Sequence, residues 1–179
     1  KIMTRLFDTT PIMVTHSVES GLVKSTIPQE LGSDLLCNMA YAHTHHQDGP
    51  VMVIDFGTAL TFSTVSRKGE VLGVAIAPGL VTAVNALFGA TAQLPQVELK
   101  VPDTVLGRDS MGSIRAGIME GYAGLVERII RKTEEELGER VYVMATGGLS
   151  TTISTLIDRL DELDPILTLR GLSLIASLN

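Results

Sequence analysis

The residues with the clearest chemical potential are Asp55, Gly57, Thr58 and Thr61, which close or follow the apolar run at residues 51–54. A carboxylate at the end of a buried strand can hold a cation or a metal-bound water. A glycine lets the backbone approach an anion, while threonine hydroxyls and nearby amides donate hydrogen bonds to phosphate oxygens. An ordinary capped turn is the alternative reading of such a segment. The three-strand pattern around it favours a phosphate loop.

Two further segments combine glycines with an expected helix start. Thr146, Gly147 and Gly148 follow an apolar run and precede a predicted helix. A helix N-terminus offers unpaired N–H groups to an anion, and adjacent glycines let a base or ribose lie against the backbone. Gly32 and Asp34 open an earlier helix, where the helix dipole favours a carboxylate. For each of these segments taken alone, a simple turn or cap is the favoured reading.

The elements that must position these residues alternate between strands and helices. Apolar spacing and turn residues predict strands over residues 12–15, 51–54, 60–64, 70–77, 97–101 and 141–145, and helices over 30–46, 80–92, 110–137, 148–160 and 167–178. The β-β-β-α-β-α-β-α order from residue 51 onward is that of a ribonuclease-H-like domain in an α/β protein. Actin-like kinases contain two such domains. We therefore expect residues 1–50 to be the C-terminal part of a first domain and residues 51–179 to form the second.

Composition limits the classes of function. The 179 residues are 45% hydrophobic and 19% charged, which is typical of a packed globular protein. A net charge of −6 without a run of Lys or Arg argues against nucleic acid or an acidic membrane surface as partner. No apolar run reaches the roughly 20 residues that span a bilayer. Cys37 is the only cysteine, so an intramolecular disulfide is impossible, and a reducing cytoplasm is the expected location.

In content, order and spacing, the motifs resemble those of type III pantothenate kinases. The matching segments are residues 32–34, 53–59, 73–79, 94–99, 113–118, 145–149 and 164–172. The most specific are Ala-Pro-Gly at 77–79 and the ending Asp-Pro-x-Leu-Thr-Leu-x-Gly-Leu at 164–172. The resemblance covers nearly the whole chain from about Gly21.

This resemblance implies an ATP-dependent phosphorylation of pantothenate to 4′-phosphopantothenate, the first step of coenzyme A biosynthesis. It further implies an actin-like homodimer in the cytoplasm that uses a divalent metal (Mg²⁺) and a monovalent cation (K⁺ or NH₄⁺). The roles implied for single residues are a general base at Asp34, a monovalent-cation ligand at Asp55, ATP binding at Gly57, Thr58, Thr61, Thr146, Gly147 and Gly148, and pantothenate binding at Gly32 and Ser110. In the family, a threonine at the Ser110 position reaches pantothenate in the partner subunit.

Two features depart from the family pattern. Leu35 stands where the family has an arginine, and leucine cannot take over a charged or bidentate role. The family's Asp-x-Gly-Asn-Thr loop, which holds the ATP phosphates and helps to bind Mg²⁺, has no match in the 179 residues. We expect the chain to be a portion of a longer protein. Two alternatives stay open: a non-catalytic or regulatory paralogue, and an actin-like kinase for another small hydroxylated substrate.

Overall fold

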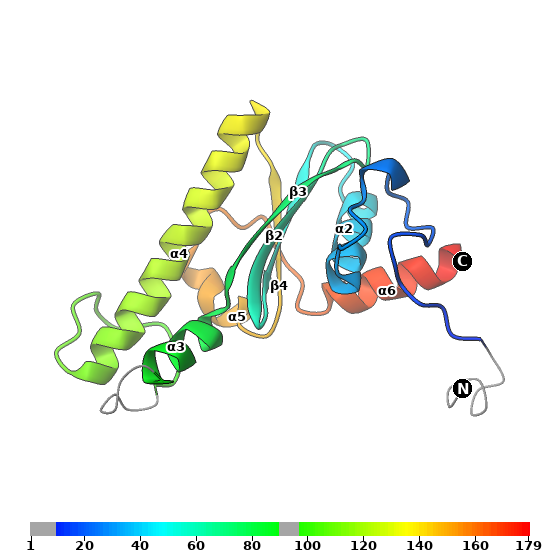
Figure 1. The fold of residues 1–179 in the computed structure, drawn as a ribbon. Coiled ribbons are helices and arrows are strands. Elements are labelled where there is room, and N and C mark those ends of the chain that lie inside the picture. The colour runs from blue at the N-terminus through cyan, green and yellow to red at the C-terminus, as the bar shows by residue number, and fades with distance from the viewer. Residues whose placement is uncertain (1–9, 90–96) are drawn as a thin grey trace.

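The computed structural model describes residues 10–89 and 97–179, which form a five-stranded sheet covered by helices (Figure 1). The strands are β1 (Val51–Phe56), β2 (Ala59–Val65), β3 (Val71–Pro78), β4 (Tyr142–Thr146) and β5 (Glu162–Leu163), in the spatial order β3-β2-β1-β4-β5. The first three form an antiparallel meander. Strand β4 then pairs parallel to β1, and β5 pairs parallel to β4.

Helices lie on both sides of the sheet, as Figure 1 shows. The helices on one side are α3 (Leu80–Gly89), α4 (Ser110–Leu137) and α5 (Ser150–Ile153), and those on the other side are α2 (Ser33–His45) and α6 (Leu167–Leu178). Short 3₁₀ turns occupy Lys24–Thr26 and Ser154–Leu156. This strand order, with helices on both faces, confirms the predicted ribonuclease-H-like (actin-like ATPase) fold class.

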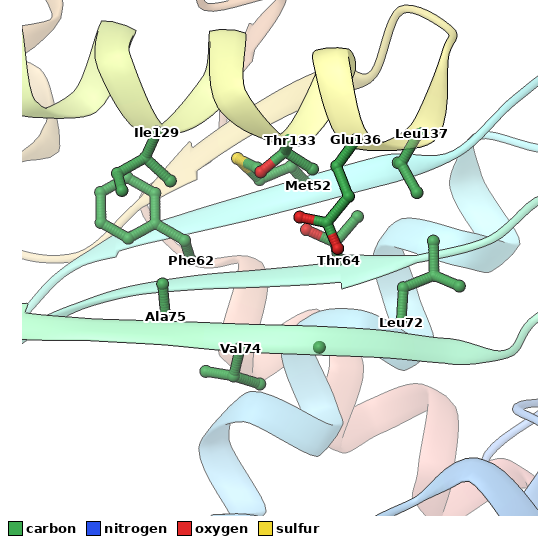
Figure 2. Close-up of a pocket in the computed structure, with 11 residues that line it drawn as sticks. Met52, Phe62, Thr64, Leu72, Val74, Ala75, Ile129, Thr133, Glu136 and Leu137 are labelled. Atoms are coloured by element: carbon green, nitrogen blue, oxygen red, sulfur yellow. The ribbon is translucent and has the colours of Figure 1, made fainter.

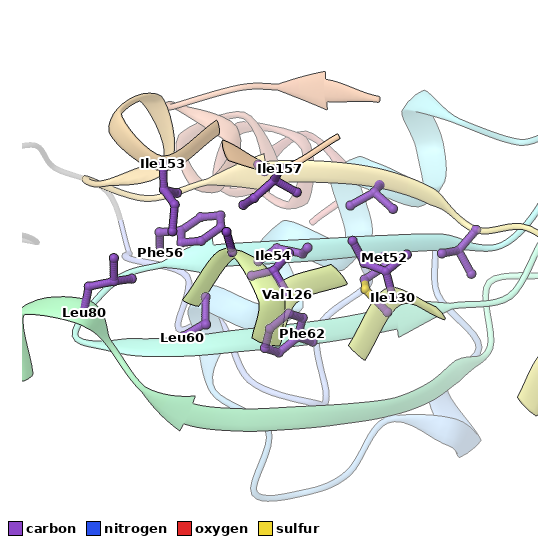
Figure 3. Close-up of a cluster of buried hydrophobic side chains, with 14 of the residues drawn as sticks. Met52, Ile54, Phe56, Leu60, Phe62, Leu80, Val126, Ile130, Ile153 and Ile157 are labelled. Carbon is purple, nitrogen blue, oxygen red and sulfur yellow. The ribbon is translucent and has the colours of Figure 1, made fainter. Parts of the chain in front are cut away.

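Strand β1 is buried on both faces, which explains its nearly continuous apolar sequence. Its side chains alternate between two cores, because successive residues of a strand point to opposite faces. Met52, Ile54 and Phe56 belong to the core beneath α4 (Figure 3), whereas Val51 and Val53 belong to the core beneath α2 and α6. The same alternation turns the next residue, Asp55, toward α2 and α6. The charged end of β1 is therefore on the α2–α6 face.

The predicted strand at residues 97–101 is wrong. Val97 is buried and Leu99 packs against the core beneath α4, so the apolar alternation reflects contacts with helices. The Glu98 carbonyl accepts a hydrogen bond from Arg115 Nε of α4 (3.1 Å) instead of one from a neighbouring strand. The predicted strand at residues 12–15 is also wrong: this segment has no strand pairing, and Met13 is 75% exposed.

The predicted helix at residues 148–160 is wrong beyond its first turns. Only α5 and the following 3₁₀ turn form, in a stretch rich in serine and threonine. Ser150 Oγ bonds to the Gly147 carbonyl and Ser154 Oγ to the Thr151 carbonyl, which is the local competition that makes such residues poor helix formers. The chain then enters β5, which the sequence did not predict because its two residues, Glu162 and Leu163, carry no apolar pattern.

The remaining predicted elements are confirmed, and the ends of several differ from the prediction by one to three residues. Helices α4 and α6 have the predicted bounds, and Gly138, the C-cap of α4, has a left-handed φ of 72°. Residues 90–92 of one predicted helix, residues 94–96 of one matching motif and residues 1–9 lie outside the described residues. The division at residue 50 stays a prediction. Among the described residues, no helix combines the length and apolarity needed to cross a membrane.

Candidate active site

The candidate site is built around Asp55 at the end of β1. The sheet register places Thr61 of β2 and Thr146 of β4 directly opposite Asp55. Residues paired in this way project from the same face, so three oxygen-bearing side chains meet on the α2–α6 face. Thr61 is only 9% exposed, and its Oγ1 has no hydrogen-bond partner within the described part of the chain. A buried hydroxyl without a partner is costly, so a ligand at this point would relieve it.

Two side chains that sequence reasoning missed complete the cluster. Asn38 of α2 is fully buried, and its Nδ2 donates to Asp55 Oδ2 (3.3 Å). Thr168 of α6 donates from Oγ1 to Asn38 Oδ1 (2.7 Å). The signal that could have found Asn38 is a lone amide inside the otherwise apolar stripe of α2. Thr168 lies within the C-terminal motif but received no role.

Burial shifts the pKa of the Asp55 carboxyl. Removal from water raises its pKa above the usual value of 3.8, the Asn38 hydrogen bond opposes this effect, and the nearby Asp34 charge adds to it. The ionised carboxylate is thus insufficiently compensated by the protein alone. A cation bound beside it would supply the missing compensation.

The second oxygen of Asp55 faces two glycine turns. A Cβ built on Gly147 would lie 2.4 Å from Asp55 Oδ1 and 2.6 Å from the Phe56 nitrogen, and Gly147 has a φ of 94°. A Cβ on Gly57 would lie 3.4 Å from the same Oδ1. The Leu149 N–H reaches the Phe56 carbonyl oxygen at 3.5 Å, which ties the two turns together. Position 147 therefore requires glycine, both for its positive φ and for lack of space, whereas a Cβ at position 57 would make only an ordinary van der Waals contact.

Residues at the start of α3 stabilise the Gly57–Thr58 turn by hydrogen bonds. Gly79 N donates to the Thr58 carbonyl (3.0 Å), and Thr82 Oγ1 donates to the same oxygen (2.7 Å). A Cβ on Gly79 would collide with the Gly57 carbonyl at 2.2 Å. The Ala-Pro-Gly motif therefore fixes the turn, while the Thr58 side chain stays exposed.

The Gly32–Asp34 segment lies at the N-terminus of α2. Gly32 is the N-cap, and a Cβ there would lie 2.5 Å from Asp34 Oδ1, so the glycine leaves room for this carboxylate. Asp34 is exposed, and its charge acts on Asp55, which places it at the edge of the cluster. The neighbouring Leu35 is buried among the apolar residues beneath α2 and α6.

The structure brings most of the predicted site residues together, with one exception. The residues at the carboxyl ends of β1 and β4, near the start of β2 and at the start of α2 are Gly32, Asp34, Asp55, Gly57, Thr58, Thr61, Thr146, Gly147 and Gly148. Ser110 is the exposed first residue of α4, on the other side of the sheet from Asp34 (Figure 1). A pocket between α4 and strands β2 and β3, with Thr133 and Glu136 at its wall, contains none of the predicted residues (Figure 2).

The donor set suits a hard cation better than a protein-held transition metal. Carboxylate and hydroxyl oxygens are ligands for hard cations, whereas zinc-type sites use His and Cys. Across residues 10–89 and 97–179, no group of three or more His, Cys, Asp or Glu side chains could hold a metal ion. Asp55 and the Thr61 hydroxyl, which has no partner among the described residues, offer oxygen ligands of this kind.

Solved structures place the chain in a fold class. A Baf family protein from Campylobacter jejuni matches with a TM-score of 0.60 and 21% identity, over 85% of this chain and 66% of that one. The filament structure of Alp12 matches with a TM-score of 0.55 and 14% identity, over 79% and 51%. At these identities the likeness concerns the fold, which is that of the actin-like ATPases.

Sequence comparisons narrow the class to a family. The profile of type III pantothenate kinase matches residues 1–132. The type III pantothenate kinase of Moorella thermoacetica is 39% identical over all of this chain and 70% of its own length. That of Roseiflexus castenholzii is 42% identical over 98% of this chain and 69% of its own. The chain belongs to the type III pantothenate kinase family.

Proposed function

We propose that the protein transfers the γ-phosphoryl group of ATP to the 4′-hydroxyl of pantothenate, the first step towards coenzyme A. The observation that carries this proposal is the convergence of Asp34, Asp55 and the two glycine turns at one end of the sheet. Phosphoryl transfer depends mainly on positioning and charge stabilisation, so backbone turns and carboxylates suffice as protein groups. Membership of the kinase family supports the same reaction.

Asp34 is the proposed general base. Its exposed carboxylate, over the N-cap glycine, can accept the proton of the pantothenate hydroxyl as that oxygen bonds to the γ-phosphorus. The bond that breaks joins the γ-phosphorus to the β–γ bridging oxygen, which leaves with ADP. The backbone of the Gly57–Thr58 turn and the Thr58 hydroxyl orient phosphate oxygens. The Gly147–Gly148 turn gives the nucleoside side close access to the backbone.

The proposed cofactors are Mg²⁺ with ATP and a monovalent cation, K⁺ or NH₄⁺, beside Asp55. When bound, these cations neutralise phosphate charge during transfer. The buried Asp55 carboxylate and the unpartnered Thr61 hydroxyl support the monovalent site. We also propose a cytoplasmic location, which the single buried thiol, Cys37, supports. Cell fractionation with an antibody against the protein tests that location.

Isotope transfer tests the reaction directly. The full-length protein, incubated with γ-labelled ATP, Mg²⁺, K⁺ and pantothenate, should produce labelled phosphopantothenate. Asp34→Asn should lower kcat by roughly 10²–10⁴, the usual worth of general base catalysis, because the isosteric amide cannot take the proton. Since Asp34 is exposed, the variant should unfold at the same denaturant concentration as the parent. Full activity in the variant would remove Asp34 from the proposed role.

We further propose a homodimer, because Ser110 lies across the sheet from Asp34. If Ser110 contacts pantothenate, it does so in the site of a second copy. Mixing inactive Asp34→Asn subunits with Ser110→Ala subunits should then create some sites with both native residues. Activity above that of either variant alone supports the shared site. Sedimentation velocity gives the oligomeric state independently, and a monomer at assay concentration would exclude the dimer.

A non-catalytic relative is the second candidate, and the buried position of Leu35 favours it. Leucine at this point packs in the core and offers no charge to an anionic substrate. Under this alternative, the full-length protein binds ATP in calorimetry but transfers no label to pantothenate. A small-molecule hydroxyl acceptor other than pantothenate would instead appear as ADP release that depends on that acceptor. Labelled phosphopantothenate from the parent protein excludes both alternatives.

A further inference from the structure

The Asn38 amide links three elements that are distant in sequence. Its Nδ2 donates to Asp55 Oδ2 of β1 (3.3 Å), and its Oδ1 accepts from Thr168 Oγ1 of α6 (2.7 Å). Asn38 has no exposed surface, so water cannot replace either partner. Both ends of the amide are therefore used, which is how a buried polar group is normally satisfied.

The negative charge of Asp55 determines which end of the Asn38 amide faces it. An ionised carboxylate only accepts hydrogen bonds, so the NH₂ end of Asn38 must face Asp55. The Asn38 oxygen then faces α6 and needs a donor, which the Thr168 hydroxyl provides. Removing that hydroxyl would leave a buried amide oxygen without a partner and weaken the preference for this orientation.

The packing of α6 on α2 is tight enough to hold this link in place. A Cβ built on Gly171 would lie 2.0 Å from the Cys37 carbonyl oxygen, so the two helix backbones touch. Thr168 precedes Gly171 by three residues and shares its helix face. Asn38 follows Cys37 on α2. The close crossing therefore brings the Thr168 hydroxyl to the Asn38 amide.

From this geometry we propose that Asn38, oriented by Thr168, is a positioning residue that fixes one oxygen of Asp55 and leaves the other free for a cation. Oδ2 is held by Asn38, while Oδ1 lies against the Gly57 and Gly147 turns, beside which the proposed monovalent cation binds. This inference rests on the proposed function, because it assigns α6 a part in building that same site. Both residues act on the cation through Asp55 and are assigned no contact with the substrate.

The test compares two substitutions at one position in the full-length protein. Thr168→Val removes the hydroxyl with little change in volume, and Thr168→Ser keeps the hydroxyl. The first readout is the K⁺ concentration that gives half of the K⁺-induced rise in thermal unfolding temperature, with tetramethylammonium keeping the ionic strength constant. The second is the K⁺ concentration for half-maximal kinase activity. The first readout needs no turnover.

We expect Thr168→Val to raise both half-effect concentrations about tenfold, the worth of one hydrogen bond in a charged network, while Thr168→Ser changes them less than about twofold. The turnover number at saturating K⁺ should be largely preserved. Thr44→Val is the matched control, because the Thr44 hydroxyl donates to the Ala40 carbonyl within α2 itself, at the end of the helix away from Asp34. It should leave the K⁺ dependence unchanged.

Equal K⁺ dependence in the valine and serine variants overturns the proposal, whether both resemble the parent or both are impaired. If the valine variant does not fold, Asn38→Leu, which replaces the amide by an apolar group of similar size, must show the raised K⁺ requirement, and parent-like values overturn the proposal. A parent protein that does not respond to K⁺ or NH₄⁺ also overturns it. Failure of the proposed function is distinct, since it appears as no phosphopantothenate from the parent protein.

Discussion

Gly147 and Gly148 are adjacent, but only the first is required by the fold. A Cβ on Gly147 would lie 2.4 Å from Asp55 Oδ1, 2.6 Å from the Phe56 nitrogen and 2.7 Å from the Phe56 carbonyl carbon. Two of these atoms are backbone, so they cannot move aside cheaply. Gly147 also has a φ of 94°, which side-chain-bearing residues rarely adopt. A Cβ on Gly148 would meet nothing within 4 Å.

The cost of Gly147→Ala follows from these two effects. A non-glycine residue in a sparsely populated backbone region costs roughly 1–3 kcal/mol, and overpacking costs about as much again. Together they predict a loss of about 2–6 kcal/mol, a large part of the roughly 5–15 kcal/mol that stabilises a domain. Gly148→Ala should change the free energy of unfolding by no more than about 0.5 kcal/mol.

Urea unfolding followed by circular dichroism measures the difference. With an m-value of about 2 kcal/mol/M, the midpoint of Gly147→Ala should fall by about 1–3 M, while that of Gly148→Ala stays close to the parent. The two variants differ from the parent by the same methyl group, so composition and denatured-state effects largely cancel. Equal midpoints for the two variants would refute the argument that the end of β1 occupies the space beside Gly147.

Three further predictions concern the scaffold. Gly171→Ala should destabilise the protein by about 1–3 kcal/mol or more in urea unfolding, because the added methyl group would overlap the Cys37 backbone. Gly117→Ala on α4 is the control: it has open space around it and should stabilise the protein by about 0.5–1 kcal/mol. Asp109 caps α4, so Asp109→Ala should cost about 1 kcal/mol by the same measurement and Asp109→Asn much less. Burial lowers the pKa of His43 below 6.5, so protonation favours the unfolded state; stability present above pH 6.5 should fall as the pH drops below it, and urea midpoints at pH 7 and pH 5 should differ less in His43→Leu.

The meander and the Gly57–Thr58 turn could be predicted from sequence because their signals are local. The apolar run of β1 ends at Asp55, and turn residues separate it from β2, so period and punctuation together define the element. The helix α4 carries its own stop signal in Gly138. In each case, the residues that decide the structure lie within a few positions of one another.

The links between elements could not be predicted in this way. Asn38 and Thr168 are 130 residues apart, and their contact depends on the close crossing of two helices at Gly171. The strand prediction at residues 97–101 was wrong for a different reason. The alternation of apolar residues there does reflect burial, but the segment packs against a helix and not within a sheet. Strand β5 was missed because two residues with an acidic start give no periodic signal.

The end of β1 shows why stability and ligand binding are coupled in this fold. The ionised Asp55 carboxylate is disfavoured by burial, and its pKa is raised, so the folded state holds a proton more tightly than the unfolded chain. Stability contributed by this group is therefore greatest below pH 3.8 and declines as the pH rises through the raised pKa. A cation that binds only the folded state reverses that penalty by mass action. The Asn38 amide offsets part of the burial but occupies one oxygen only.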